Sequence, residues 1–246
     1  MSIQVITKGK QAFGSFNNGD IIENKPIGFP QDGGEIKAYS NIFYWAHAHS
    51  ERGSTIGLHP HRGFEIISYV LKGTIKHYDT KTDKWLSLDE GSFQVIKSGK
   101  GISHSEEICA ESAIFQIWFD PNINKSQYKD AEYKDYQSSS LPVESQKSID
   151  IKTIVGEKSP VNLDTEEISI REISLKKNHI LPLETKSIYS IYIIHGKIIL
   201  NGQIVNKDDF AIIEDENQLT ISVDRLSKIF IIASPKTPSY KTCINS

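Results

Sequence analysis

Two short segments concentrate the side chains of this chain that could do chemistry. Residues 58–65 read LHPHRGFE, and residues 99–107 read GKGISHSEE. Because alternate side chains of an extended strand point to the same face, His59 and His61 would project together, and so would His104 and Glu106. Three imidazoles and one carboxylate that face one another suit a divalent first-row transition metal and leave coordination positions open. The spacing therefore predicts a metal site.

The other histidines have no such matched arrangement. His47 and His49 also lie two residues apart, but no second segment pairs with them, so we interpret them as a polar rim. His77 lies on a predicted hairpin, and His179 and His195 lie in the second half of the chain. We expect all three to be solvated, as polar side chains mostly are.

Side chains next to the predicted ligands are expected to support them. Arg62 follows His61 and points to the opposite face of the strand, where a pairing with Glu65 is one role for it. Phe64 is expected in the core, because buried aromatic side chains dominate cores; lining the mouth of the pocket is the alternative. Gln116 shares a strand face with Trp118 and is a candidate hydrogen-bond donor to the ligands.

The composition is that of an ordinary soluble globular protein. The 246 residues are 38% hydrophobic and 24% charged, and the net charge of -3 argues against a polyanionic partner such as nucleic acid. Cys109 and Cys243 show no pairing pattern, which favours a reducing compartment. The N-terminus lacks the apolar core of a signal peptide, and no apolar run approaches the ~20 residues of a membrane helix. We expect a cytoplasmic protein, with a nuclear location open in a compartmented cell.

Short apolar segments separated by turn residues predict a β protein with two domains. In the first half they flank the two histidine segments, and Gly99 and Gly101 allow a tight turn before His104. Residues 122–150 are charged and serine-rich, which is typical of a linker. Isoleucine-rich strand candidates resume after it, with no convincing long helix. We predict an N-terminal domain at 1–121, a linker at 122–150 and a C-terminal domain at 151–246.

The two halves look like copies of one unit, and such a repeat decides the architecture. Setting Gly196 over Gly73 places the LPLE segment that begins at Leu181 on the LHPH segment of the first half. Counting forward from matched later strands, Ile221 and Val223 take the places of the two ligands in the second segment. The second copy is therefore predicted to keep the barrel and to lose the metal.

The motifs also resemble a known family. HPHRGFE and GKGISHSE, with YVLKG at 69–73, EGSFQ at 90–94 and FQIW at 115–118, are similar to the pirin family of the cupin superfamily. The resemblance extends over most of the chain. It implies an all-β fold of two tandem cupin jelly-roll barrels, with one metal site in the N-terminal barrel. The family's metal ligands fall on His59, His61, His104 and Glu106.

The resemblance also implies the identity of the metal. One divalent ion per chain is expected, and Fe(II) is the first choice because the family mostly carries iron. The donor set by itself also accepts Mn, Co, Ni, Cu or Zn. The wider superfamily often takes its carboxylate from the first motif, which keeps Glu65 as a fallback for Glu106.

In the reaction that the family suggests, a flavonol such as quercetin reacts with dioxygen, and its central ring opens with release of carbon monoxide. Glu106 would accept the proton of the flavonol 3-hydroxyl group, since a carboxylate at a metal can act as general base. The alternative is a non-enzymatic iron-binding protein that senses redox state and binds a protein partner. A cupin isomerase or sugar-binding protein ranks below both. We expect a monomer that contacts neither nucleic acid nor membrane.

Overall fold

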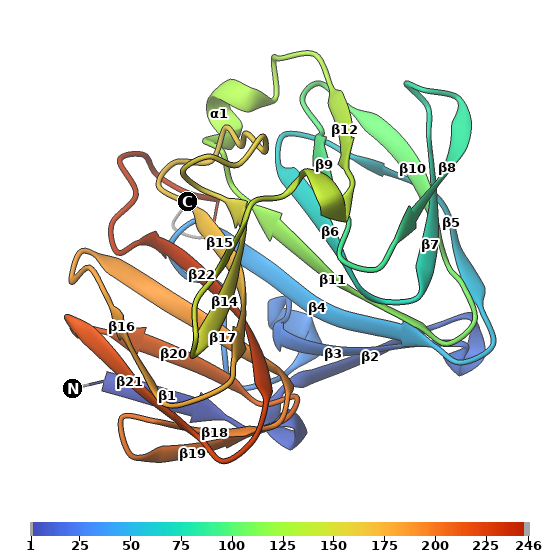
Figure 1. Ribbon diagram of the computed structural model, residues 1–246. Helices are drawn as coiled ribbons and strands as arrows, with labels where there is room; N and C mark the ends of the chain where they lie inside the picture. Colours follow the sequence, from blue (N-terminus) through green and yellow to red (C-terminus); the bar gives the residue numbers. More distant parts are fainter. Residues whose placement is uncertain (1, 244–246) are drawn as a thin grey trace. The chain divides into compact units, whose positions relative to one another are not determined.

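The computed structural model describes residues 2–243, which form an all-β protein (Figure 1). The chain divides into two compact units, and each has one seven-stranded and one four-stranded sheet. We call the first the N-terminal barrel; of the described residues it comprises Gln11–Ser140, Leu163–Thr165 and 238–243. The C-terminal barrel comprises residues 2–10, Leu141–Asn162 and Glu166–Thr237. The predicted fold class, with two tandem cupin barrels, is confirmed.

The N-terminal barrel carries both histidine segments. Its large sheet has the order β12 (Glu132–Tyr136), β9 (Phe93–Lys97), β6 (Glu65–Lys72), β11 (Ser112–Phe119), β4 (Ile42–Ser50), β3 (Ile21–Ile27) and β2 (Ala12–Phe16). Its small sheet has the order β5 (Ser54–His61), β10 (Ile102–Ile108), β7 (Thr74–Asp79) and β8 (Lys84–Asp89). The first histidine segment thus ends β5, and the second runs along β10 beside it.

The C-terminal barrel repeats this arrangement. Its large sheet has the order β1 (Ser2–Ile6), β20 (Phe210–Glu214), β17 (Ser187–His195), β22 (Ser227–Pro235), β15 (Ser169–Leu175), β14 (Ile149–Val155) and β13 (Val143–Ser145). Its small sheet has the order β16 (His179–Pro182), β21 (Gln218–Val223), β18 (Lys197–Leu200) and β19 (Gln203–Asn206). Each of its sheets therefore has a counterpart in the N-terminal barrel.

Helical segments are few and short. The α-helix α1 spans Ile123–Ser126, and four 3-10 turns occupy Lys8–Lys10, Asn17–Gly19, Pro30–Asp32 and Ser138–Ser140. Within residues 2–243, no helix has the length and the apolar character that crossing a membrane would require.

The units do not follow the predicted boundaries. Strand β1 pairs with β20, so the start of the chain belongs to the C-terminal barrel. Residues 122–140 of the expected linker belong to the N-terminal barrel, where β12 extends the large sheet at the edge of β9. Tyr133 and Asp135 on β12 both accept a hydrogen bond from the amide of Gln94. The strand therefore lacks the apolar alternation by which strands are predicted.

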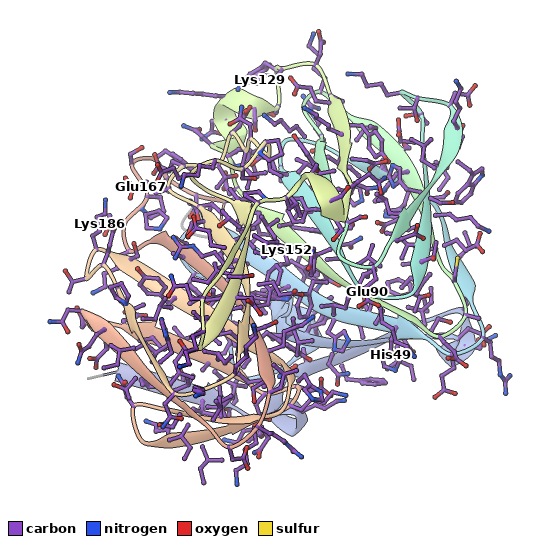
Figure 2. The ribbon with its side chains drawn as sticks, in the orientation of Figure 1. His49, Glu90, Lys129, Lys152, Glu167 and Lys186 are labelled. Carbon is purple, nitrogen blue, oxygen red and sulfur yellow. The ribbon has the colours of Figure 1, made fainter. Side chains whose placement is uncertain are left out.

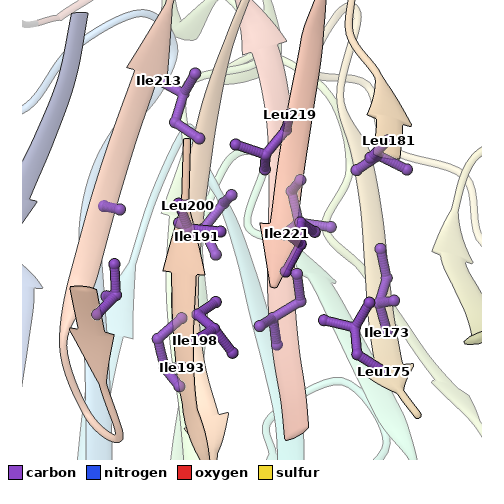
Figure 3. Close-up of a cluster of buried hydrophobic side chains, with 14 of the residues drawn as sticks. Ile173, Leu175, Leu181, Ile191, Ile193, Ile198, Leu200, Ile213, Leu219 and Ile221 are labelled. Carbon is purple, nitrogen blue, oxygen red and sulfur yellow. The ribbon is translucent and has the colours of Figure 1, made fainter. Parts of the chain in front are cut away.

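The cores of the two barrels differ in composition. One continuous cluster of leucine, isoleucine and valine side chains fills the C-terminal barrel (Figure 3). In the N-terminal barrel, Ile108 and Ile102 belong to two separate apolar clusters. Both lie on β10, and His104 and Glu106 lie between them on that strand. The interior of the N-terminal barrel is thus interrupted by polar side chains at the predicted site.

Candidate metal centre

The three predicted histidine ligands converge between β5 and β10. His59 lies directly opposite His104 in the pairing of the two strands, and the Nε2 atoms of His61 and His104 are 2.8 Å apart. The candidate ligand atoms of His59, His61 and His104 all lie within 4.8 Å of one another. Three imidazoles at this separation can bind one ion.

The hydrogen bond of His59 defines which of its nitrogens is available. Its Nδ1 lies 2.8 Å from the carbonyl oxygen of Gly57 and donates to it, which leaves the lone pair on Nε2. A hydrogen bond from the second ring nitrogen to a backbone carbonyl is the usual way in which proteins orient a metal-binding histidine. His59 is half-buried, whereas His61 and His104 are buried, so His59 forms the solvent side of the cluster.

Burial keeps the two inner imidazoles uncharged. Desolvation lowers the pKa of His61 to about 3, with a further contribution from His104. The pKa of His104 falls to about 2, again mainly through burial, and His59 and His77 contribute. Neutral imidazoles are the form that binds metal ions. Both side chains are therefore available as ligands at neutral pH.

Glu106 lies on the same strand and is held by the opposite sheet. The pairing of β10 with β5 shifts between His104 and Glu106, where β5 carries one extra residue. Ser68 on β6 donates its hydroxyl to Oε1 of Glu106 at 3.1 Å, and Gln116 on β11 donates its amide to Oε2. The hydrogen bond expected from Gln116 is therefore present, and the two donors together fix the orientation of the Glu106 carboxylate.

Sequence reasoning missed His77. The expectation that it is solvated is wrong, because it is fully buried on β7. Its ring nitrogens and the ligand atoms of His104 and Glu106 form a second group within 4.8 Å. It stacks on Tyr133 with ring centroids 4.6 Å apart, and Asp79 Oδ2 lies 3.3 Å from its Nε2. The signal was present in the sequence, since His77 is in phase with the apolar Ile75 on β7.

The four predicted ligands thus form two overlapping groups rather than one. His104 belongs to both, whereas Glu106 lies in the group with His77. The Nδ1 atoms of His104 and His77 are buried and have no hydrogen-bond partner within residues 2–243. Neutral imidazole nitrogens with one carboxylate are donors that a divalent first-row ion prefers. This His/Glu cluster could therefore hold a metal ion.

Glu65 and Arg62 lie outside the cluster. Glu65 accepts backbone hydrogen bonds from Asp164 at 2.7 Å and from Thr165 at 2.9 Å, and a third from the hydroxyl of Thr165. Desolvation raises its pKa, although these bonds and Lys97 act in the opposite direction. The pairing of Arg62 with Glu65 is not formed, because residues 163–165 occupy the carboxylate, and Arg62 is exposed.

Aromatic side chains border the cluster on the side of His61. Phe64 and Trp118 stack with centroids 4.9 Å apart, and they lie 5.4 Å and 5.2 Å from the ring of His61. Both are half-buried. Phe64 is therefore not the core residue that was expected; it forms part of an aromatic wall beside the candidate ligands.

The remaining histidines stay apart from the cluster. His47 and His49 are half-buried on β4, with ring centroids 6.0 Å apart, and neither joins the metal-binding groups of the described residues. His195 is exposed, as expected, and His179 is half-buried.

The repeat between the barrels is visible in two equivalent glycines. Gly73 and Gly196 both have positive φ, and a Cβ on either would lie 2.2 Å from a serine hydroxyl, that of Ser112 or Ser227. This supports the overlay of Gly196 on Gly73. The same contact makes Ser227 the counterpart of Ser112. The strands before these two serines, β21 and β10, can therefore be aligned by counting back from them.

The positions predicted by counting along the repeat need correction. In the C-terminal barrel Leu181 pairs with Leu219, as His59 pairs with His104. Counting back from the two serines, Ile221 takes the place of Glu106 and Leu219 that of His104. The sequence prediction had placed Ile221 and Val223 at these two positions, which is two residues too far along the chain. The reason is that the β20–β21 connection is shorter than the β9–β10 loop. Figure 3 shows Leu181, Leu219 and Ile221 within the apolar cluster, so the ligand positions hold hydrocarbon.

Comparisons with known proteins show which proteins this chain resembles. Residues 35–119 match the family model described as Pirin. Quercetin 2,3-dioxygenase of Escherichia coli K12 is 28% identical over 193 residues, which cover 75% of this chain and 78% of that protein. Pirin-like protein 2 of Arabidopsis thaliana is 36% identical over 100 residues, covering 40% of this chain and 30% of that protein.

A solved structure has the same fold. The bacterial pirin YhhW of Escherichia coli, in complex with nickel(II), superimposes with a TM-score of 0.78 and 20% identity. The match covers 95% of this chain and 99% of that one.

Proposed function

We propose, from the match of residues 35–119 to the pirin family model, that the protein is a metal-dependent dioxygenase of the quercetinase type. Its substrates would be a flavonol and dioxygen. The observation that carries the proposal is the meeting of three imidazoles and a buried carboxylate beside a half-buried aromatic wall. The quercetin dioxygenase of Escherichia coli among its relatives supports this choice of reaction.

We assign His59, His61, His104 and Glu106 as the ligands of one divalent ion. Fe(II) is the first choice, and Mn, Co, Ni, Cu and Zn are alternatives that the same donors accept. Nickel(II) in the Escherichia coli pirin supports a divalent first-row metal. His77 is adjacent to Glu106 and is a further nitrogen donor if the coordination rearranges.

Glu106 is the residue that we expect to accept the 3-hydroxyl proton of the flavonol. A bound metal would polarise that hydroxyl oxygen and bring the substrate together with dioxygen. Ser68 and Gln116 each donate to one oxygen of Glu106, which fixes the plane of the carboxylate. A positioned carboxylate of this kind is an effective general base.

The aromatic wall suits a flat aromatic substrate. Phe64 and Trp118 are half-buried and lie next to His61. Offset stacking on such rings contributes about 0.5–1.5 kcal/mol beyond burial of area. The wall would hold the flavonol rings while the hydroxyl group faces Glu106.

The decisive experiment is anaerobic reconstitution with Fe(II), Mn(II), Ni(II) or Cu(II), followed by measurement of oxygen uptake and carbon monoxide release with quercetin. Metal-dependent uptake that is lost in His59→Ala is the expected result. His195→Ala is the matched control, because His195 is exposed and far along the sequence in the other barrel. Glu106→Gln should keep most of the metal and lose turnover; full turnover in this variant would contradict the base assignment.

A second candidate function is an iron-binding, redox-sensing regulatory protein that binds a protein partner. Two observations favour it: a relative in Arabidopsis is named a pirin-like protein, and His61, His104 and Glu106 are almost inaccessible to solvent. Stoichiometric metal binding without oxygen uptake, for every metal tested, would select this function over the dioxygenase.

A further inference from the structure

The C-terminal barrel contains a cavity that the metal centre does not explain. Its volume is about 490 Å³, within the range of small-molecule binding sites. It is lined from β15, β17 and β22 of the large sheet and from β16 of the small sheet, so it lies at one end of this barrel. Glu167 and Lys186, both labelled in Figure 2, are among the residues that line it.

The cavity exists because small residues replace the aromatic wall of the N-terminal barrel. On β11 of that barrel Trp118 pairs with Tyr44 of the neighbouring strand, and the two rings lie 4.6 Å apart. At the same place in the C-terminal barrel, Ala233 pairs with Ser169.

The position of Phe64 is also taken by a small residue. Phe64 lies two residues before Ile66, which pairs with Trp118, and Ser187 lies two residues before Tyr189, which pairs with Ala233. Three large aromatic side chains thus correspond to two serines and an alanine, and the space that they would fill is left open.

The inner part of the cavity is apolar. Leu181, Leu183 and Ile231 line it, and all three belong to the hydrophobic cluster of Figure 3. They stand where His59, His61 and Gln116 stand in the N-terminal barrel. A ligand here would meet hydrocarbon instead of metal ligands, so it must carry an apolar body.

The outer part of the cavity presents one unpaired cation and several hydroxyl groups. The guanidinium of Arg171 has no ion pair or side-chain hydrogen bond within residues 2–243, whereas Lys186 is paired with Glu184 at 3.4 Å. The hydroxyl oxygen of Tyr189 accepts from the backbone of Glu184 at 2.8 Å, so its own hydrogen remains available to a ligand. The hydroxyl of Ser187 also lines the cavity.

We propose that the C-terminal barrel binds a small organic carboxylate, with its apolar body against Leu181, Leu183 and Ile231 and its carboxylate group at Arg171. Arginine and hydroxyl donors recognise carboxylates through charge-assisted hydrogen bonds. Glu167 at the rim is an anion that opposes such a ligand, so the affinity reflects the balance between its charge and that of Arg171.

The test uses the full-length, metal-free protein, so that binding at the metal centre is excluded. Isothermal titration calorimetry with cinnamate, benzoate and octanoate as probes measures affinity, and methyl NMR of the leucine and isoleucine residues locates the site. Cinnamate should shift the methyl signals of Leu181, Leu183 and Ile231. Its neutral counterpart, cinnamamide, should bind about tenfold more weakly, as expected for loss of a charge-assisted hydrogen bond.

The variants separate the proposed contacts. Arg171→Gln should weaken cinnamate about tenfold and leave cinnamamide unchanged, whereas Lys186→Gln, the matched control, should have less than about a twofold effect. Glu167→Gln should strengthen cinnamate binding. Ala233→Trp copies Trp118, fills the cavity and should abolish binding; if it fails to fold, Ser187→Phe tests the same space.

Three outcomes would overturn the proposal. The first is equal affinity for cinnamate and cinnamamide, or an Arg171→Gln variant that binds like the wild type. The second is weaker binding of cinnamate in Glu167→Gln, which would show that the carboxylate of Glu167 does not oppose the bound anion. The third is that none of the three carboxylates binds below roughly 10 mM, an affinity too weak for a built site.

Discussion

Removing the amide that holds Glu106 should weaken metal binding without unfolding the protein. The variant is Gln116→Leu, which has nearly the same volume. Gln116 donates to Oε2 of Glu106, while Ser68 still donates to Oε1 at 3.1 Å. The change therefore leaves one carboxylate oxygen without its donor and lets the carboxylate rotate.

The magnitude follows from the kind of bond that is lost. A hydrogen bond to a charged group contributes about 1.5–3 kcal/mol. If that free energy holds Glu106 in its ligating direction, metal affinity should fall about 10-fold to 100-fold, which is the usual effect of removing such a supporting group. Ser68→Ala should act in the same direction. Because both donors hold one carboxylate, the double variant should deviate from additivity.

The assay is competition for Fe(II) or Ni(II) against a chelator of known affinity, with circular dichroism and thermal unfolding to verify the fold. Ile231→Leu is a matched control, because Ile231 occupies the position equivalent to Gln116 in the barrel that lacks the ligands. Wild-type metal affinity in a folded Gln116→Leu protein would refute the role of Glu106 as a held ligand.

Three further predictions rest on single residues. Burial lowers the pKa of His61 to about 3, so below about pH 6.5 this histidine takes up a proton in the unfolded chain but not in the folded one. The free energy of unfolding of the metal-free protein should therefore fall by up to ~1.4 kcal/mol per pH unit through this residue. Urea midpoints measured at neutral and acid pH that shift equally in wild type and His61→Gln would contradict this. Glu65→Ala removes the acceptor of three hydrogen bonds and should lower stability by about 2–4 kcal/mol in thermal unfolding while metal stoichiometry stays at the wild-type value; loss of metal at unchanged stability would instead make Glu65 a ligand. Trp118→Leu should raise KM for the flavonol several-fold with metal content unchanged, and steady-state kinetics with an unaltered KM would exclude the aromatic wall from substrate binding.

The parts of the site that the sequence predicted are those set by one strand. His59 and His61 face the same side because they are two residues apart on β5, and the same rule applies to His104 and Glu106 on β10. The resemblance to a family then indicated which strands meet. The phase of His77 with Ile75 indicated that it is buried, but only the closed barrel places it against Glu106.

The errors arose where the position of one segment depends on another. Strand β12 is polar because Tyr133 and Asp135 hydrogen-bond with Gln94, so its sequence was typical of a linker. The repeat was aligned correctly at Gly73 and Gly196, because both turns require a positive φ, a backbone conformation that favours glycine. It drifted by one or two residues elsewhere, since loops differ in length without changing the strands that they join.

The two barrels show what the metal centre costs in stability. At equivalent positions one interior holds Ser68, Gln116 and Glu106 and the other Ile191, Ile231 and Ile221. Burial of apolar surface stabilises the fold by about 1.5–3 kcal/mol for each isoleucine side chain. The three polar side chains stabilise it only if each of them keeps its hydrogen-bond partner. Buried nitrogens that have no partner among residues 2–243, such as Nδ1 of His77 and His104, destabilise the metal-free protein. A metal ion that binds only the folded barrel offsets this penalty: it stabilises the fold by about 2.7 kcal/mol when its free concentration is a hundred times its dissociation constant. If the cluster holds a metal ion as proposed, the stability of the N-terminal barrel should depend on that ion, whereas the corresponding interior of the C-terminal barrel is hydrocarbon and should not respond to it.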